Sequence, residues 1–221
     1  MSGDSLLDDE GEGSLLDAPG MGVGAVYLMR HGHTVLDVSK RSDSWLDMPL
    51  SDTGRLSVVP AQQYLKTVPL ACIYTPDLKR TLETAQIVKS GTLSDPDIDV
   101  SDDARTWNLG ILAGTRKRYG RPEVQKLIDN PDRAPMGGES FNDFRDRFLP
   151  WFDEATEDAT RAEPVLIVGS GSNLRLIGQA LLGDADALDL DEGGLACLHS
   201  VNGRWHGQVI LGVDDADGDI S

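Results

Sequence analysis

The pentapeptide Arg30-His31-Gly32-His33-Thr34 combines residue types that suit phosphoryl transfer. A neutral imidazole can attack phosphorus through a ring nitrogen and form a phosphohistidine. A guanidinium beside it can hold two phosphate oxygens with its planar fork. Gly32 lets the backbone turn sharply and approach a ligand closely. His31 is therefore the candidate nucleophile and Arg30 the candidate phosphate ligand, while the alternative is a surface His beside a surface Arg.

A second turn of small residues, Gly169-Ser170-Gly171-Ser172, follows an apolar run. Such turns hold anions or display a nucleophile. Its pattern differs from the Gly-x-Ser-x-Gly of serine hydrolases. A serine nucleophile also needs a base, and His199 and His206 belong to a terminal hairpin. We therefore do not expect serine-hydrolase chemistry at Ser170.

Alternating strands and helices must position these residues. Apolar runs at 25–29, 71–75 and 164–168 predict strands that are covered on both faces. Amphipathic segments at 51–65, 78–91, 139–155 and 173–183 predict helices, and a hairpin follows at 195–212. The sequence thus predicts an α/β fold: a three-layer α/β/α sandwich with a mostly parallel central sheet. Ligands collect at the carboxyl ends of strands in such sheets, which is where Arg30 and His31 stand.

Local signals refine these elements. Ser51 is the predicted N-cap of the first long helix, and Pro60 predicts a kink or restart within it. Four phenylalanines at spacings of three and four predict a buried helical stripe; they are Phe141, Phe144, Phe148 and Phe152.

Composition and charge bound the class of protein. The 221 residues fit one domain, which we place at 25–212, with acidic tails at 1–24 and 213–221. The net charge of −17 argues against nucleic-acid and membrane partners. No apolar run is long enough for a transmembrane helix, and the start lacks a secretory pattern. Cys72 and Cys197 form no CxxC pair and are expected as buried free thiols, which favours the cytoplasm.

The tetrapeptide SLLD occurs twice near the start, at 5–8 and 14–17. One interpretation is a disordered tail. The other is a docking peptide whose paired leucines bind a protein partner. A homodimer is a further assembly that we consider.

Five separated blocks resemble, in order, the histidine phosphatase superfamily, a phosphoglycerate-mutase-like family of phosphatases and mutases. They are YLMRHGHT, DMPLSDTGR, IYTPDLKRTLETAQIV, GGESFNDFRDRF and VLIVGSGSNLRLI. The resemblance covers about residues 25–212. It implies a phosphoglycerate mutase-like fold, with His31 as nucleophile beside Arg30 and with Arg80 as a second phosphate ligand.

The chain departs from the family pattern at two important positions. The family usually has a second His after its late strand, and aligning Val168 and Arg175 puts Ser170 there. Losing such a donor costs on the order of 100- to 1000-fold in rate. We therefore expect weak or slow activity, whether Ser170 is natural or an engineered His→Ser change. Thr106 stands where the family often has a Glu general acid.

The proton donor for the leaving group is left open by these departures. His33, Glu139 and Asp77 are candidates. His33 has a suitable ordinary pKa but could equally be a surface residue. Glu139 could instead be a partner of a helix dipole.

Candidate substrate contacts come from several segments. They are Thr34, Arg41, Asn173, Arg116 and Arg118. Arg116 and Arg118 belong to the basic stretch GTRKRYGRPE, which either begins a solvated helix or draws in a polyanion.

The predicted function is a metal-independent phosphatase that acts on a phosphorylated small molecule through a phosphohistidine, with nucleotide-like compounds among the candidate substrates. We expect no metal site and no cofactor. One alternative is a non-catalytic phospho-ligand binder or structural partner that uses the same pocket. A mutase is the third hypothesis, for which a second phosphate subsite is not evident.

Overall fold

The computed structural model describes residues 25–157, 159 and 163–212. Both SLLD copies and the acidic C-terminal stretch lie outside the described residues, and so do the predictions about them. The strands are β1 (Ala25–Arg30), β2 (Cys72–Thr75), β3 (Asp97–Val100), β4 (Val165–Gly169), β5 (Leu195–Val201) and β6 (Arg204–Leu211). The α-helices are α1 (Val35–Val38), α2 (Asp52–Ser57), α3 (Val59–Leu65), α4 (Lys79–Gly91), α5 (Lys117–Ile128), α6 (Phe141–Thr156) and α7 (Gly171–Ile177).

The strands form one mixed sheet in the order β3-β2-β4-β1-β5-β6. The neighbouring strands from β3 to β1 run parallel, whereas β5 is antiparallel to both β1 and β6. The α/β prediction is confirmed, with a sheet that is parallel on one side of β1. Arg30 lies opposite Gly169 in the β1–β4 register. This register brings the turn after β1 and the turn after β4 to the same edge of the sheet.

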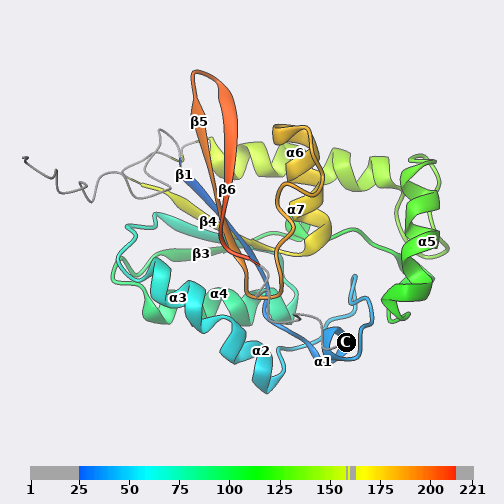
Figure 1. Ribbon diagram of the computed structural model, residues 1–221, viewed down its shortest axis with the longest axis horizontal. Helices are drawn as coiled ribbons and strands as arrows, with labels where there is room; N and C mark the ends of the chain where they lie inside the picture. Colours follow the sequence, from blue (N-terminus) through cyan, green and yellow to red (C-terminus); the bar gives the residue numbers. More distant parts are fainter. Residues whose placement is uncertain (1–24, 158, 160–162, 213–221) are drawn as a thin grey trace, which may run out of the picture.

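Helices cover both faces of this sheet, as Figure 1 shows. On one face, Val26 and Leu28 pack with the buried residues of α6 and α7. On the other, Tyr27 and Met29 pack with those of α3 and α4. The continuous apolar run of β1 predicted a strand that is buried on both faces, and the structure confirms this.

Local predictions about the helices are confirmed. Ser51 caps α2 by accepting a hydrogen bond from Gly54 N at 3.0 Å. The predicted helix is interrupted at Val58, and Pro60 lies in the first turn of α3, where its missing N–H costs nothing. Within the aromatic stripe of α6, Phe144, Phe148 and Phe152 are at most 1% exposed; Phe141 is half-buried.

Two strand features differ in how well the sequence predicted them. The hairpin turn at Asn202-Gly203 has positive φ at both residues, as a tight turn of this kind requires. The edge strand β3 was missed because its residues, Asp-Ile-Asp-Val, are mostly exposed and form no apolar run.

Cys197 is a buried free thiol as expected, whereas Cys72 is half-buried. Among the described residues, no helix combines the length and the apolar character that crossing a membrane requires.

Candidate active site

A cavity of about 130 Å³ lies at the sheet edge where β1 and β4 end. It collects residues that are far apart in the sequence. Its lining includes Arg30, His31, Arg80 and Ser170 from the predicted set, together with Asp37, Asp43, Thr106 and Lys117. The structure therefore brings together the four residues on which the predicted chemistry depends.

His31 is oriented by its own turn. The ring is 4% exposed, and Nδ1 lies 2.8 Å from the carbonyl oxygen of Gly32. Because a carbonyl can only accept, Nδ1 carries the proton and Nε2 keeps a lone pair. Burial, followed by the charge of Arg80, lowers the pKa of His31 to about 3. The ring is therefore neutral at ordinary pH, which is the state that a nucleophile needs.

Arg80 is fully buried in α4. Its Nε–H donates to Nε2 of His31 at 3.2 Å. The two other guanidinium nitrogens donate to backbone carbonyls, Nη1 to Leu46 at 2.9 Å and Nη2 to Ser44 at 2.7 Å. The carbonyls hold the guanidinium plane against the imidazole, so that an incoming phosphoryl oxygen can take over the Nε–H.

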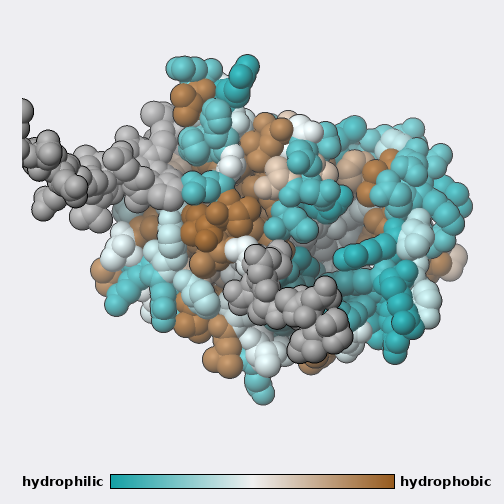
Figure 2. All heavy atoms as spheres, in the orientation of Figure 1, coloured by the Kyte–Doolittle hydropathy of each residue, from teal (hydrophilic) through white to brown (hydrophobic). Residues whose placement is uncertain are grey.

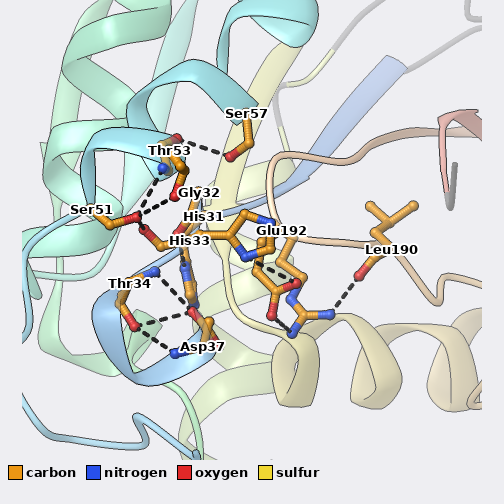
Figure 3. Close-up of polar contacts among 12 residues, drawn as sticks. His31, Gly32, His33, Thr34, Asp37, Ser51, Thr53, Ser57, Leu190 and Glu192 are labelled. Carbon is orange, nitrogen blue, oxygen red and sulfur yellow. Dashed lines mark hydrogen bonds and ion pairs between the residues drawn. The ribbon is translucent and has the colours of Figure 1, made fainter. Parts of the chain in front are cut away.

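Arg30 is held from the other side. Its Nη2 pairs with Glu192 at 2.6 Å and its Nη1 donates to the Leu190 carbonyl at 2.6 Å. Figure 3 labels these two partners, Glu192 and Leu190. Lys117 lies 3.3 Å from the same Glu192 oxygen. Glu192, whose side chain is 10% exposed, thus positions two cations, a role that the sequence analysis did not assign to it.

Ser170 begins the turn after β4. Its backbone N–H donates to the Asn173 side chain at 3.1 Å, and Asn173 also donates toward the Ala104 carbonyl at 3.4 Å. The Asn173 side chain therefore bonds to backbone groups and is not part of the cavity lining, and its predicted substrate contact stays a prediction.

Two polar atoms beside the cavity are buried without a hydrogen-bond partner among the described residues: Nε of Arg30 and Oγ of Ser170. Leaving a buried donor unpaired costs roughly 1–3 kcal/mol. Both residues line the same cavity as His31. An anion with several oxygens can accept hydrogen bonds from both donors at once.

Two buried carboxyls in the cavity were missed by the sequence analysis. Asp37 accepts from Thr34 N at 3.1 Å and pairs with Lys117 at 3.1 Å, and Figure 3 shows the Thr34 contact. Asp43 lies within 3.1 Å of the Thr34 hydroxyl through both of its oxygens. The spacing of Asp37 from the Arg-His-Gly turn could have suggested the first, because a capping box begins at Thr34. Asp43 carried no comparable signal.

The three predicted proton donors lie elsewhere. Glu139 accepts from Arg147 and from Asn108 N, both at 2.8 Å. Asp77 pairs with Arg105. His33, with a side chain 38% exposed, faces Glu192 at 3.7 Å. Since none of the three lines the cavity, the structure does not support the candidate roles given to Glu139 and His33.

The remaining predicted substrate contacts also fall outside the cavity. Thr34 is fully buried and supports the two carboxyls. Arg41 donates to the Gly114 carbonyl at 2.7 Å. Arg116 and Arg118 line a separate hollow with Lys40 and Arg121. That hollow belongs to the surface around α5, where Figure 2 shows many hydrophilic side chains.

His31, Asp37 and Asp43 offer potential metal-ligand atoms within 4.8 Å of one another. Both ring nitrogens are already engaged, Nδ1 with the Gly32 carbonyl and Nε2 with Arg80. Arg30, Arg80 and Lys117 add positive charge that opposes a cation. These contacts favour a proton rather than a metal ion between the carboxyls, and the predicted lack of a metal site stays a prediction.

Comparison with known proteins gives a consistent result. The model of the histidine phosphatase superfamily, branch 1, matches residues 26–215. A glucosyl-3-phosphoglycerate phosphatase of Mycolicibacterium vanbaalenii is 31% identical over 173 residues, which is 74% of this chain and 76% of the relative. A 2,3-bisphosphoglycerate-dependent phosphoglycerate mutase of Bartonella henselae is 30% identical over 167 residues, which is 72% of this chain and 81% of the relative.

Solved structures agree. A mycobacterial glucosyl-3-phosphoglycerate phosphatase superposes with a TM-score of 0.72 at 25% identity, covering 86% of this chain and 100% of that protein. YhfR of Bacillus stearothermophilus superposes with a TM-score of 0.71 at 30% identity, covering 86% of this chain and 98% of that protein.

Proposed function

Because the chain belongs to branch 1 of the histidine phosphatase superfamily, we propose that it is a metal-independent phosphatase that hydrolyses a phosphorylated small molecule through a phosphohistidine on His31. One observation carries this proposal. The unpaired donors Arg30 Nε and Ser170 Oγ border the cavity that also contains the lone pair of His31. A phosphoryl group supplies both the acceptors that these donors lack and the electrophile for the imidazole.

The reaction has two steps. Nε2 of His31 attacks phosphorus and the ester bond breaks, while Arg30 and Arg80 stabilise the charge on the phosphoryl oxygens. Water then attacks the phosphohistidine and releases inorganic phosphate, which returns His31 to its neutral state. Gly32 holds the nucleophile in place because its carbonyl fixes the tautomer.

Ser170 is proposed as the weak point of this arrangement, in the position of the second His that the family usually has. Its hydroxyl can donate one hydrogen bond but carries no positive charge. We therefore propose slow turnover in this chain. The named activities of the two relatives make phosphoglycerates and their glycosides the first substrates to screen.

A trapping experiment tests the proposal. The chain is incubated with a phosphate-labelled aryl phosphate and quenched in alkali, in which phosphohistidine survives. We expect label on the protein that disappears in acid and is absent from His31→Ala. Hydrolysis that persists in His31→Ala would refute the nucleophile.

The second candidate function is phospho-ligand binding without turnover. Each nitrogen of Arg80 already donates one hydrogen bond to a protein atom, which favours this function because only the second N–H groups of Nη1 and Nη2 are left for a ligand. Calorimetry with vanadate separates the two. Binding without any trapped phosphoenzyme, in the chain and in Ser170→His, would support the binder.

A further inference from the structure

The proposed phosphatase lacks a proton donor for its leaving group among the residues that the sequence suggested. A leaving alkoxide needs a proton as the ester bond breaks. Glu139 and Asp77 are engaged by arginines outside the cavity, and His33 faces Glu192. Thr106 lines the cavity but is a poor acid. Lys117 also lines the cavity, but its ammonium group pairs with Asp37 and Glu192. The carboxyls that the fold brings to His31 are therefore the candidates for the donor.

We infer that Asp43 is the catalytic acid, holding the proton that the leaving oxygen takes when His31 attacks phosphorus. This inference rests on the proposed function. Asp43 is 6% exposed and lines the same cavity as His31. A carboxyl oxygen of Asp43, a ring nitrogen of His31 and an oxygen of Asp37 lie within 4.8 Å of one another.

The two carboxyls differ in their partners. Asp37 has an ammonium group at 3.1 Å, from Lys117, and a backbone N–H at 3.1 Å. Asp43 makes no ion pair within 4.0 Å among the described residues and faces the Thr34 hydroxyl. The partners of Asp37 thus stabilise its negative charge, whereas the surroundings of Asp43 favour its protonated form.

The contacts of Thr34 lead to the same assignment. Its Oγ1 lies 3.2 Å from Asp37 Oδ2 and 3.0 and 3.1 Å from the two oxygens of Asp43. A hydroxyl has one hydrogen and can donate to only one of these three oxygens. Oγ1 already accepts from the N–H groups of Leu36 and Asp37, both at 3.1 Å, so it acts only as a donor toward the two carboxyls. Its hydrogen cannot serve both carboxyls fully, and two carboxylates so close together repel each other, so a proton held by one of them is favourable. Asp43 is that carboxyl, because Lys117 stabilises the negative charge of Asp37.

The electrostatic surroundings of Asp43 raise its pKa to a value at which it still holds a proton near neutral pH. Burial, and next the negative charge of Asp37, raise the pKa of Asp43 to about 7, although Arg80 and Thr34 oppose the shift. Burial also disfavours the charged form of Asp37, yet His31, Lys117 and the Thr34 N–H together hold its pKa well below the usual range. The pair therefore keeps one proton at neutral pH, as close carboxyls do.

Each proton is accounted for in the reaction. In the first step the N–P bond forms, the P–O ester bond breaks, and the Asp43 proton moves to the leaving oxygen. In the second step Asp43, now a carboxylate, takes a proton from the water that attacks phosphorus. The N–P bond breaks, phosphate leaves, and Asp43 and neutral His31 are restored. Asp37 acts as a positioning residue that keeps the Asp43 proton in place.

The leaving group tests this role. Dinitrophenyl phosphate releases a stable phenolate and needs no acid, whereas glycerol 3-phosphate releases an alkoxide that does. Both are assayed with the full chain and with Ser170→His, each with and without Asp43→Asn. We expect Asp43→Asn to lower kcat/KM for glycerol 3-phosphate by about 100-fold or more and for dinitrophenyl phosphate by less than about 3-fold. The matched control is Asp52→Asn, an exposed carboxylate in the first turn of α2.

A second measurement needs no variant and so does not depend on folding. With glycerol 3-phosphate, kcat should fall as the pH rises past about 7, because Asp43 loses its proton there. With dinitrophenyl phosphate this fall should be absent. If Asp43→Asn lowers kcat/KM equally for both substrates, or if both substrates give the same pH profile, Asp43 is not the catalytic acid. Either result would leave the proposed phosphatase function intact. If neither protein hydrolyses dinitrophenyl phosphate, the proposed function fails and the acid role fails with it.

Discussion

Nε of Arg80 lies 3.2 Å from Nε2 of His31, with the guanidinium fully buried and its two other nitrogens bonded to backbone carbonyls. This contact aligns a cation with the lone pair that attacks phosphorus. It also helps to keep the imidazole neutral. Burial is the main cause of the lowered pKa of His31, and the charge of Arg80 is the next. One buried arginine thus controls both the protonation and the direction of the candidate nucleophile.

Arg80→Lys should disable the site although it keeps the charge. A lysine ammonium cannot satisfy the Ser44 and Leu46 carbonyls and His31 in one plane. We expect kcat/KM for dinitrophenyl phosphate to fall on the order of 100-fold or more. Arg118→Lys, an exposed position on α5, serves as the control and should keep the parent rate. Full activity in Arg80→Lys would contradict the phosphate-binding role of Arg80.

Ser170→His should raise activity. An imidazolium at the cavity wall adds a charged donor to the phosphoryl oxygens, and such a donor is worth on the order of 100- to 1000-fold in rate. The measurement is kcat/KM with dinitrophenyl phosphate. The double variant His31→Ala/Ser170→His should be silent, because the new imidazole replaces a donor and not the nucleophile. If the single variant shows no gain in kcat/KM, the serine at position 170 is not what limits the rate.

Chelation should leave the activity unchanged. Both nitrogens of His31 are engaged by protein atoms, and three cationic side chains line the cavity. We expect equal rates before and after dialysis against EDTA, measured with the Ser170→His protein for sensitivity. A loss of rate that zinc or manganese restores would refute metal independence.

Gly32→Ala should damage the fold at the site. A Cβ at Gly32 would come 2.3 Å from the Gly54 carbonyl oxygen and 2.9 Å from a Val58 methyl carbon. The backbone must shift to relieve this overlap, at a cost of about 1–3 kcal/mol in the free energy of unfolding. Urea unfolding measures the cost. In the control Gly169→Ala, the new Cβ would meet Asn173 at 3.4 Å, an ordinary contact, and the loss should be smaller.

The pH dependence of the free energy of unfolding should show that Asp43 holds a proton in the folded state. Between the ordinary carboxyl range and about pH 7, the folded chain keeps a proton that the unfolded chain has lost. Stability must then decrease as the pH rises through this window. Asp43→Asn removes this dependence, so the free energy of unfolding of the variant relative to the parent should increase from pH 5 to pH 8. A constant difference, as expected for Asp52→Asn, would show that Asp43 ionises normally.

The sequence by itself determined the elements and the first half of the site. Continuous apolar runs required strands buried on both faces, and the spacing of the phenylalanines required a helix facing the core. Arg30 and His31 could be placed at the end of a strand, because residue type and position in the chain are enough for that. Family resemblance added Arg80 and marked Ser170 as the residue where a second imidazole usually stands.

Only the tertiary structure decided which charges meet. Asp37, Asp43 and Lys117 reach the cavity from α1, the loop after it and α5, and no local pattern encodes that convergence. Glu139 and His33 had suitable chemistry in the sequence but point to Arg147 and Glu192. The physical reason is that a side chain acquires its chemistry from its neighbours. Burial and a facing carboxylate give Asp43 its proton, and both exist only after distant segments have packed together.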